Sequence, residues 1–451
     1  MSGASASGVA TRDGQLVRAI GTWGLAASIV NVTVGGGIFR LPGSPDVSGR
    51  LGAAAPLAYL ACAVVMGLVV LCIAQAGSRI ALTGGPYAYV EATFGRYVGF
   101  LVGVLLWVIG STAIPGVAGL FADAGARLVP WIGTLGGRAL FIGIIFALVT
   151  WVNVRGVKQG TRLNVVLTLA KLAPLLLLLV GGLAAAKGAN LRWAHGVPAA
   201  ADLSRASVIL IFAFAGVESA LVPSGEVRDS AHSVPRAVFL AMAMVTLLYI
   251  GLQVVSQGVL GAALPGSATP LADAAGRVFG AWGILMISAG FMISAFGYLS
   301  GMMLAVPRAL FAFARDGILP RPLATVHPRF HTPWIAIVAQ STLCWALAVL
   351  NSFETLAIIA NVSAALVYIG CAAAAWKLTR ATAPAAQHSF AIPGGATVPI
   401  LAIIAIAFLL SAVTMREWSV LVIVLVVASL LYLVSGRRDY NSREEETTEE
   451  P

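Results

Sequence analysis

The chain has 451 residues, of which 59% are hydrophobic and only 10% are charged. Soluble domains carry about 25% charged residues, so the composition excludes a soluble globular protein and indicates an integral membrane protein. The net charge of +10 does not indicate nucleic-acid binding, because the basic residues are spread among the loops. Cys62, Cys72, Cys344 and Cys371 lie in apolar stretches without metal-ligand spacing, which predicts core residues and no disulfide framework.

Charge-poor apolar segments long enough to cross about 30 Å of hydrocarbon define the predicted membrane spans. No signal peptide is predicted before the first of them, because residues 1–14 are small and polar. Twelve such segments follow in order: 21–42, 51–78, 97–122, 139–154, 163–186, 206–225, 237–263, 278–307, 334–353, 355–376, 397–415 and 418–435. Twelve spans put both termini on one side, and that side holds about twice as many Lys and Arg residues as the other. This bias predicts a multi-pass protein of the inner (cell) membrane with cytoplasmic termini.

Three consecutive glycines, Gly35, Gly36 and Gly37, interrupt the first span. Each lowers helix stability by about 1 kcal/mol relative to alanine, so an unbroken helix is not expected here. In a membrane, an unwound backbone is stable only where protein buries it or where it lines a watery cavity. The N–H groups that start the second half-helix are then candidate receptors for an anion. The alternative is close helix–helix packing through small residues.

The sixth span carries a second candidate interruption at Gly216, followed by the ionisable Glu218. A charge in the middle of a membrane is costly and by default indicates function, the alternative being a protonated glutamate bonded to a neighbouring helix. Spans one and six are five apart, and matching interruptions in two halves point to a transporter site at the bilayer midplane.

Two further features stand out from the apolar background. Lys171 lies about two turns into the fifth span, where it could change its charge or stand in place of a bound cation. The alternative is that its side chain reaches the cytoplasmic interface. Residues 83–95 predict a turn and an amphipathic stretch, either a gating element or a plain interfacial loop.

Four motifs resemble those of the amino acid–polyamine–organocation transporter superfamily, in the order and at the spacing of that family. They are Gly35-Gly-Gly-Ile-Phe39, Gly84-Gly-Pro-Tyr-Ala-Tyr89, Phe214-Ala-Gly-Val-Glu-Ser219 and Pro307-Arg-Ala-Leu-Phe-Ala-Phe-Ala-Arg-Asp-Gly317. The resemblance implies an all-α membrane fold of twelve helices, a LeuT-like five-plus-five inverted repeat with broken helices one and six. The implied organisation is a cytoplasmic tail (1–18), a transporter core (19–377, repeats about 19–187 and 205–377), two added spans (396–436) and a disordered acidic tail (437–451).

The resemblance also implies sodium-independent secondary transport of an amino acid by alternating access, as an exchanger or a proton symporter. The implied receptors of the α-carboxylate are the amides of Gly35, Gly36 and Gly37, and those of the α-amino group are carbonyls near Phe212, Phe214 and Ala215. Ile38 and Gly216 complete the set of expected substrate-binding residues. The implied coupling or gating residues are Lys171, Glu218, Phe212 and Tyr298. Lys171 matches a family lysine that stands in for a sodium ion and bridges spans one and eight. No cofactor, metal or nucleic acid is expected; the expected partners are an amino acid, the bilayer and coupling protons, for a monomer or homodimer.

Three positions depart from the family pattern. Gly36 stands where the family usually has Ser or Thr, Phe212 where arginine/agmatine exchangers often have Trp, and Met302 near another of their aromatic residues. Because no acidic residue other than Glu218 lies near the predicted pocket, neutral amino acids are expected, with a basic amino acid or polyamine antiporter as the alternative. An enzyme is disfavoured because the five histidines lie in loops or at span ends and no nucleotide-binding loop occurs. A channel is disfavoured because no filter-like motif or charge ring occurs.

Overall fold

The computed structural model describes residues 21–79, 86–155, 161–193, 196–216, 230–315, 317–380 and 394–448, and its regular elements there are all helical. The α-helices are α2 (Thr22–Thr33), α3 (Gly37–Arg40), α4 (Ala55–Arg79), α5 (Pro86–Phe94), α6 (Arg96–Leu128), α7 (Leu135–Arg155), α8 (Thr161–Ala185), α9 (Ala200–Phe214), α11 (Ser230–Leu260), α12 (Pro270–Phe279), α13 (Ala281–Ala305), α14 (Pro307–Arg315), α15 (Trp334–Leu350), α16 (Phe353–Arg380), α17 (Thr397–Leu410) and α18 (Met415–Thr448). Short 3₁₀ or π turns are η1 (Leu41–Gly43), η2 (Pro45–Gly49), η3 (Gly52–Ala54), η4 (Pro130–Gly133), η5 (Gly188–Leu191), η7 (Gly261–Ala263) and η8 (Arg321–Ala324).

Seven helical stretches in the described part of the chain are long and apolar enough to cross a membrane. They are Gly52–Gly77, Arg96–Ala126, Leu135–Arg155, Arg236–Ala263, Ala281–Arg315, Phe353–Arg380 and Met415–Val434. Three shorter apolar helices are Lys171–Ala185, Trp334–Leu350 and Thr397–Leu410. Each of these ten coincides with a predicted span. The two predicted spans missing from this set, the first and the sixth, are those in which glycines interrupt the helix.

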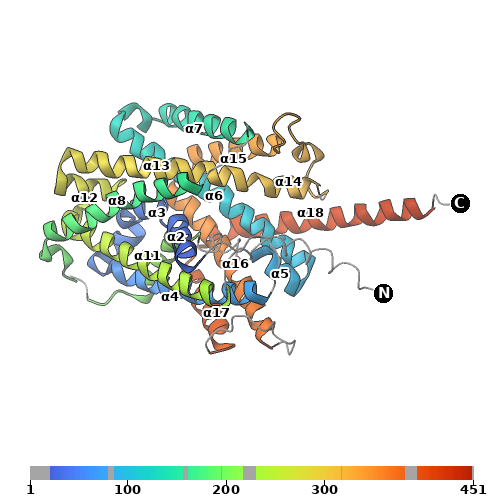
Figure 1. The fold of residues 1–451 in the computed structure, drawn as a ribbon, viewed down its shortest axis with the longest axis horizontal. Coiled ribbons are helices and arrows are strands. Elements are labelled where there is room, and N and C mark those ends of the chain that lie inside the picture. The colour runs from blue at the N-terminus through green and yellow to red at the C-terminus, as the bar shows by residue number, and fades with distance from the viewer. Residues whose placement is uncertain are drawn as a thin grey trace.

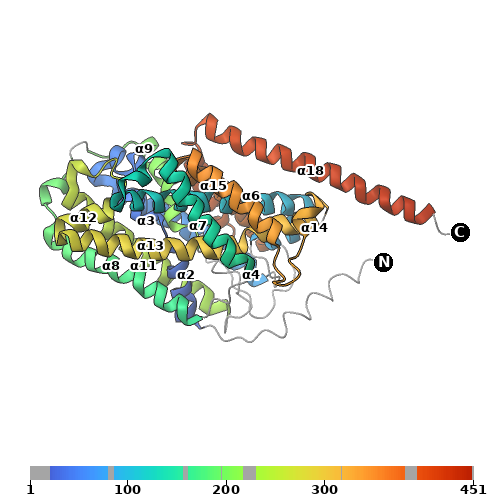
Figure 2. The ribbon, with the colours of Figure 1, turned by 90° about the horizontal axis from the view of Figure 1, so that it is seen from above.

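The helices form an elongated bundle with α16 in its interior and α18 at its edge (Figures 1 and 2). In the most apolar 18-residue stretch of α16, 72% is buried, whereas in the corresponding stretch of α18 only 11% is buried. α16 packs along α6, and its many alanines permit the close approach of the two helices. α18 instead turns apolar side chains such as Val422, Ile423 and Val426 outward, as a lipid-facing helix does. All four cysteines are free and buried, as expected of core residues.

The two ends of the bundle carry different short helices: α12 lies at one end and α14 at the other (Figures 1 and 2). We refer to these as the α12 end and the α14 end. The last helix, α18, runs to Thr448. The acidic tail expected from residue 437 thus begins within this helix, and its disorder stays a prediction.

Candidate functional site

The first predicted span is divided into α2 and α3 by a non-helical segment at residues 34–36, which confirms the predicted interruption. The Val34 N–H closes the last turn of α2 by donating to the Val30 carbonyl at 2.9 Å. The Gly35 N–H donates to the Thr33 carbonyl at 2.8 Å, so this amide is already engaged. α3 begins at Gly37, and the first N–H groups of a helix have no partner within that helix. The amides available to a ligand are therefore those at the start of α3.

The second interruption follows α9, which ends at Phe214. Ala215 has extended backbone angles and donates its N–H to the Ile211 carbonyl at 2.8 Å. Gly216 has a φ of 111°, in the region that favours glycine. The helix therefore stops where the sequence predicted. Glu218 lies outside the described residues, as does the first part of the 83–95 segment, whose remainder forms α5.

The two interruptions touch each other directly. A Cβ atom added to Gly37 would lie 3.0 Å from Cδ1 of Phe212 and 3.2 Å from Cα of Ala213. A glycine at position 37 therefore lets the start of α3 pack against the backbone of α9 without crowding. Behind this contact, the Tyr249 hydroxyl of α11 lies 2.9 Å from the Thr33 carbonyl and 2.9 Å from the Ala213 carbonyl. One side chain thus joins the ends of both interrupted helices.

A cavity of about 330 Å³ lies beside the two interruptions. Its walls come from the break segments and from α6, α8, α9, α13 and α16. The lining residues are Asn31, Thr33, Gly35, Gly36, Gly37, Ile109, Ala113, Val117, Lys171, Phe212, Ala215, Gly216, Ile293, Ser294, Gly297, Tyr298, Gly301, Met302, Ala360, Asn361 and Ala364. The structure thus brings together most of the residues that the sequence analysis selected. The side chains of Ile38 and Phe214 are fully buried in the packing beside the cavity.

Lys171 of α8 is buried, with 6% of its surface exposed. Its Nζ donates a hydrogen bond to the main-chain carbonyl of Asn31 in the last turn of α2. The last carbonyls of a helix lack partners in that helix and attract positive charge. Lys171 therefore points into the bundle instead of reaching the interface. The bond to span one that the resemblance implied is present, and Tyr298 of α13, the predicted eighth span, lines the same cavity.

Asn361 of α16 is a further lining residue that the sequence analysis did not select. Its Nδ2 donates to the carbonyls of Val208 at 2.8 Å and Ile209 at 3.2 Å, both in α9. Lys171 is the charged side chain among the described lining residues, which include no carboxylate. The described wall is therefore positively charged at one point and otherwise neutral.

Two contacts join the start of α16 to the interrupted helices. Phe212 of α9 packs against Phe353 of α16, with ring centroids 5.1 Å apart and an angle of 88° between the ring planes. Arg40 at the end of α3 binds Oε1 of Glu354 through Nη2 at 2.6 Å and Nε at 3.0 Å. Arg40 also donates to the Ser267 carbonyl at 2.5 Å. The ion pair fixes α3 to the start of α16 and to the loop before α12.

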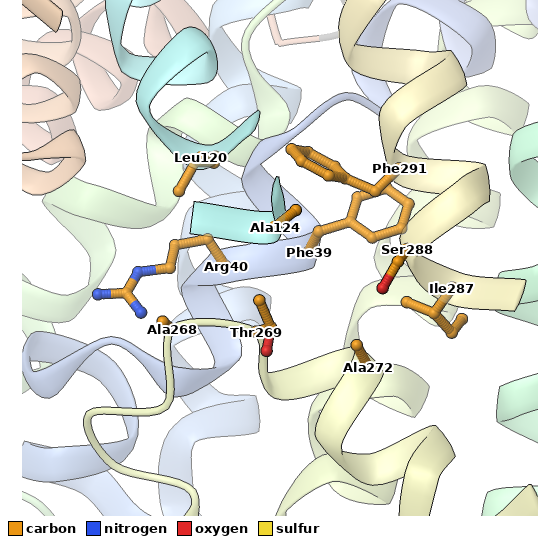
Figure 3. Close-up of a pocket in the computed structure, with 10 residues that line it drawn as sticks. All are labelled: Phe39, Arg40, Leu120, Ala124, Ala268, Thr269, Ala272, Ile287, Ser288 and Phe291. Atoms are coloured by element: carbon orange, nitrogen blue, oxygen red, sulfur yellow. The ribbon is translucent and has the colours of Figure 1, made fainter. Parts of the chain in front are cut away.

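A much smaller cavity of about 20 Å³ lies next to Arg40, between α3, α6, α12 and α13 (Figure 3). Phe39 and Phe291 form part of its wall, with ring centroids 5.1 Å apart. Thr269 and Ser288 contribute hydroxyl groups. This space has room for about one water molecule and none for an amino acid. The larger cavity is therefore the candidate binding site.

An apolar helical bundle with a buried cavity between two interrupted helices defines the class: a multi-pass membrane protein of the transporter type, not an enzyme. A family model described as "Amino acid permease" matches residues 20–437. The chain is 30% identical over 418 residues to the serine/threonine exchanger SteT of Bacillus subtilis, covering 90% of this chain and 93% of that protein. It is 27% identical over 440 residues to the methylthioribose transporter of the same organism, covering 94% of each. It is 24% identical over 446 residues to the branched-chain amino acid permease BcaP of B. subtilis, again covering 94% of each. The chain belongs to the amino acid permease family, which confirms the resemblance to the amino acid–polyamine–organocation superfamily.

Proposed function

We propose that this protein is a secondary active transporter that carries amino acids across the cell membrane by alternating access. The observation that carries the proposal is the meeting of two interrupted helices at the wall of a buried cavity. The start of a helix offers N–H groups to an anion, and the end of a helix offers carbonyl groups to a cation. An amino acid zwitterion carries a carboxylate and an ammonium group a few ångströms apart, so its site needs N–H donors and carbonyl acceptors equally close together.

The α-carboxylate binds the amides of Gly36, Gly37 and Ile38 in this proposal. These are the amides at the start of α3, whereas the Gly35 amide already donates to Thr33. The buried side chain of Ile38 is no obstacle, because only its main-chain N–H takes part. The site thus recognises the carboxylate without a basic side chain.

The α-amino group binds main-chain carbonyls at the end of α9, near Phe212, Phe214 and Ala215. The Phe212 ring, which lines the cavity and packs against Phe353, serves as a gate in this proposal. The Ala213 carbonyl is less available to the α-amino group, because it shares the hydroxyl proton of Tyr249 with the Thr33 carbonyl.

Transport is independent of sodium in this proposal, because protein donors already bind the carbonyls at the end of α2. Lys171 donates to Asn31, and Tyr249 donates to Thr33. A sodium ion would have to displace an ammonium group and a hydroxyl. Lys171, with Tyr298 and Glu218, is then part of the coupling or gating machinery of an exchanger or a proton symporter.

The proposal includes twelve spans, with an inverted repeat of residues 19–187 and 205–377. The packing of the helices supports this repeat. Each span of the first repeat corresponds to the span five places later, and three pairs of spans that are in contact have counterparts that are also in contact. The pair α2–α11 becomes α9–α4, the pair α6–α16 becomes α13–α8, and the pair α7–α13 becomes α15–α6, and helices in all six pairs are packed together. α17 and α18 are then the two added helices.

The α14 end faces the cytoplasm and the α12 end faces the outside, in the orientation that the distribution of Lys and Arg favours. The Arg40–Glu354 ion pair and the Phe212–Phe353 contact then close the cavity on its outer side. Opening to the outside requires that both contacts separate.

Neutral amino acids are the proposed substrates. A cationic side chain would find no carboxylate on the described wall and would face Lys171, which disfavours an arginine or agmatine antiporter. The serine/threonine exchanger and the branched-chain amino acid permease are relatives named for neutral amino acids. The methylthioribose transporter is named for a compound that is not an amino acid, so membership in the family does not by itself define the substrate.

Counterflow into proteoliposomes tests this proposal. Vesicles that contain the purified protein are loaded in turn with alanine, serine, leucine, arginine or agmatine, and uptake of the labelled compound is measured with and without sodium. We expect saturable uptake of neutral amino acids that sodium does not change. Exchange of arginine alone would refute the pocket argument, and a non-saturable, uncoupled flux would indicate a channel.

A further inference from the structure

Asn361 is the lining residue whose hydrogen-bonding atoms are most narrowly defined. The residue is 1% exposed, and its Nδ2 donates to two consecutive main-chain carbonyls, those of Val208 and Ile209. Carbonyl oxygens only accept hydrogen bonds, so the nitrogen of this amide must face α9 and the oxygen cannot take its place. The orientation of the amide is fixed by the helix beside it.

The amide oxygen Oδ1 of Asn361 is consequently the atom that remains for a ligand. No described residue donates a hydrogen bond to it. A buried amide oxygen without a donor costs free energy, so the site favours a ligand that supplies a donor at this point. Because oxygen is an acceptor only, the ligand group there must carry an N–H or an O–H.

The other polar side chains of the wall are less selective. Asn31, Thr33, Ser294 and Tyr298 also line the cavity, as does Lys171. A hydroxyl group can donate or accept, so Thr33 and Ser294 each tolerate either kind of partner, and the side-chain amide of Asn31 is not fixed by two carbonyls. Asn361 is therefore the side chain whose remaining atom accepts a hydrogen bond and cannot donate one.

The charge of the wall further limits which kind of donor group can bind. A cationic donor would be buried with Lys171 in the same cavity and without a carboxylate on its described wall, which is unfavourable. A neutral hydroxyl or carboxamide has no such cost. The small residues Ala360 and Ala364, near Asn361 on α16, leave space for a short side chain.

We propose that Asn361 selects amino acids whose side chain carries a neutral hydrogen-bond donor, a hydroxyl or a carboxamide, over apolar amino acids of the same size. This inference rests on the proposed function and adds to it the residue that determines specificity. The substrate hydroxyl donates to Oδ1 of Asn361 while the α-carboxylate and α-amino group bind at the two interruptions. When a methyl group replaces the substrate hydroxyl, Oδ1 of Asn361 has no donor, so the apolar amino acid binds less tightly.

Isosteric pairs of amino acids provide the test, since serine and 2-aminobutyrate, or threonine and valine, differ by a hydroxyl in place of a methyl group. Counterflow with the wild-type protein is expected to favour the hydroxyl member of each pair about tenfold or more in Vmax/KM, which corresponds to one net hydrogen bond. In Asn361→Ala the ratio is expected to fall to about one, with 2-aminobutyrate exchange retained as the internal control for folding. Ser363→Ala, which changes a buried polar residue of α16 that is not among the described lining residues, is expected to keep the wild-type preference.

Three outcomes overturn the inference. Equal use of both members of each pair by the wild-type protein shows that the hydroxyl is not recognised. A loss of the same size for every substrate in Asn361→Ala, with unchanged thermal unfolding, shows that Asn361 binds the α-amino group or positions α9 instead. An unchanged preference in Asn361→Ala assigns the selection to another residue. If no amino acid exchanges in the wild-type protein, the proposed function fails as well, so the two failures are distinguishable.

Discussion

The contact between the two interrupted helices can be tested with two adjacent glycines that receive the same methyl group. In Gly37→Ala the new Cβ lies 3.0 Å from a ring carbon of Phe212 and 3.2 Å from the Ala213 Cα, where real Cβ atoms rarely come so close to backbone. In Gly36→Ala it lies 3.4 and 3.5 Å from the Val117 methyl groups and 3.5 Å from the Phe291 ring, which is ordinary contact distance. Gly36→Ala is therefore the matched control.

The expected magnitude follows from the cost of overpacking. Forcing a methyl group into a well-packed site costs about 1 to 3 kcal/mol, and about 1.4 kcal/mol corresponds to a tenfold change in an equilibrium constant. Because the backbone of α9 cannot give way as a flexible side chain can, we expect Gly37→Ala to lower the apparent affinity for substrate by about 5-fold to 150-fold. For Gly36→Ala we expect a change of less than about threefold.

The assay is concentration-dependent counterflow in proteoliposomes, with serine as the first substrate and thermal unfolding in detergent as the measure of folding. Loss of affinity in Gly37→Ala, beside near-normal affinity in Gly36→Ala, supports the direct contact of α3 with α9. Equal effects of the two substitutions, or a Gly37→Ala variant that behaves as wild type, would refute the reasoning.

Three further substitutions test other contacts of the site. Lys171→Ala removes the donor to the end of α2, so we expect exchange to be lost or uncoupled with expression largely intact; wild-type exchange at every pH would contradict the role of a cation substitute. Tyr249→Phe removes the hydroxyl shared by two buried carbonyls and is expected to lower the free energy of unfolding by about 1 to 3 kcal/mol. An unchanged unfolding transition in detergent would show that the hydroxyl does not join the two helices. Glu354→Gln removes the charge that holds Arg40, so an Ala360→Cys reporter in the cavity should react faster with a membrane-impermeant thiol reagent added from outside. No change in that rate would mean that the ion pair does not close the cavity.

The interrupted helices could be predicted from sequence because their cause is local. Three consecutive glycines disfavour a helix, so the first break follows from residue type. The second was indicated by Gly216 with the nearby Glu218 and by its place five spans later, and Gly216 has a φ that favours glycine. The apolar segments likewise predicted where the long helices lie. Lys171 was selectable for the same reason, since a lysine in an apolar segment is conspicuous without knowledge of its partner.

The contacts between distant residues could not be predicted in this way. Arg40 and Glu354 are 314 residues apart, and neither shows which residue it pairs with. The position of Arg40 directly after the break, and the lone carboxylate of Glu354 at the start of a span, were the available signals. Asn361 was detectable as a polar residue in an apolar span, but its bonds to α9 were not. Tyr249 gave no signal, because a tyrosine in an apolar span is ordinarily a core residue.

The central claim is that the amides at the start of α3 bind the α-carboxylate of an amino acid, and competition by a substrate that lacks this charge tests it most directly. Counterflow of labelled serine is measured in the presence of unlabelled serine or of serinamide, which has the same side chain and a neutral carboxamide. The account predicts that serine competes and that serinamide competes at least about tenfold less well. Equal competition by the two compounds would contradict it.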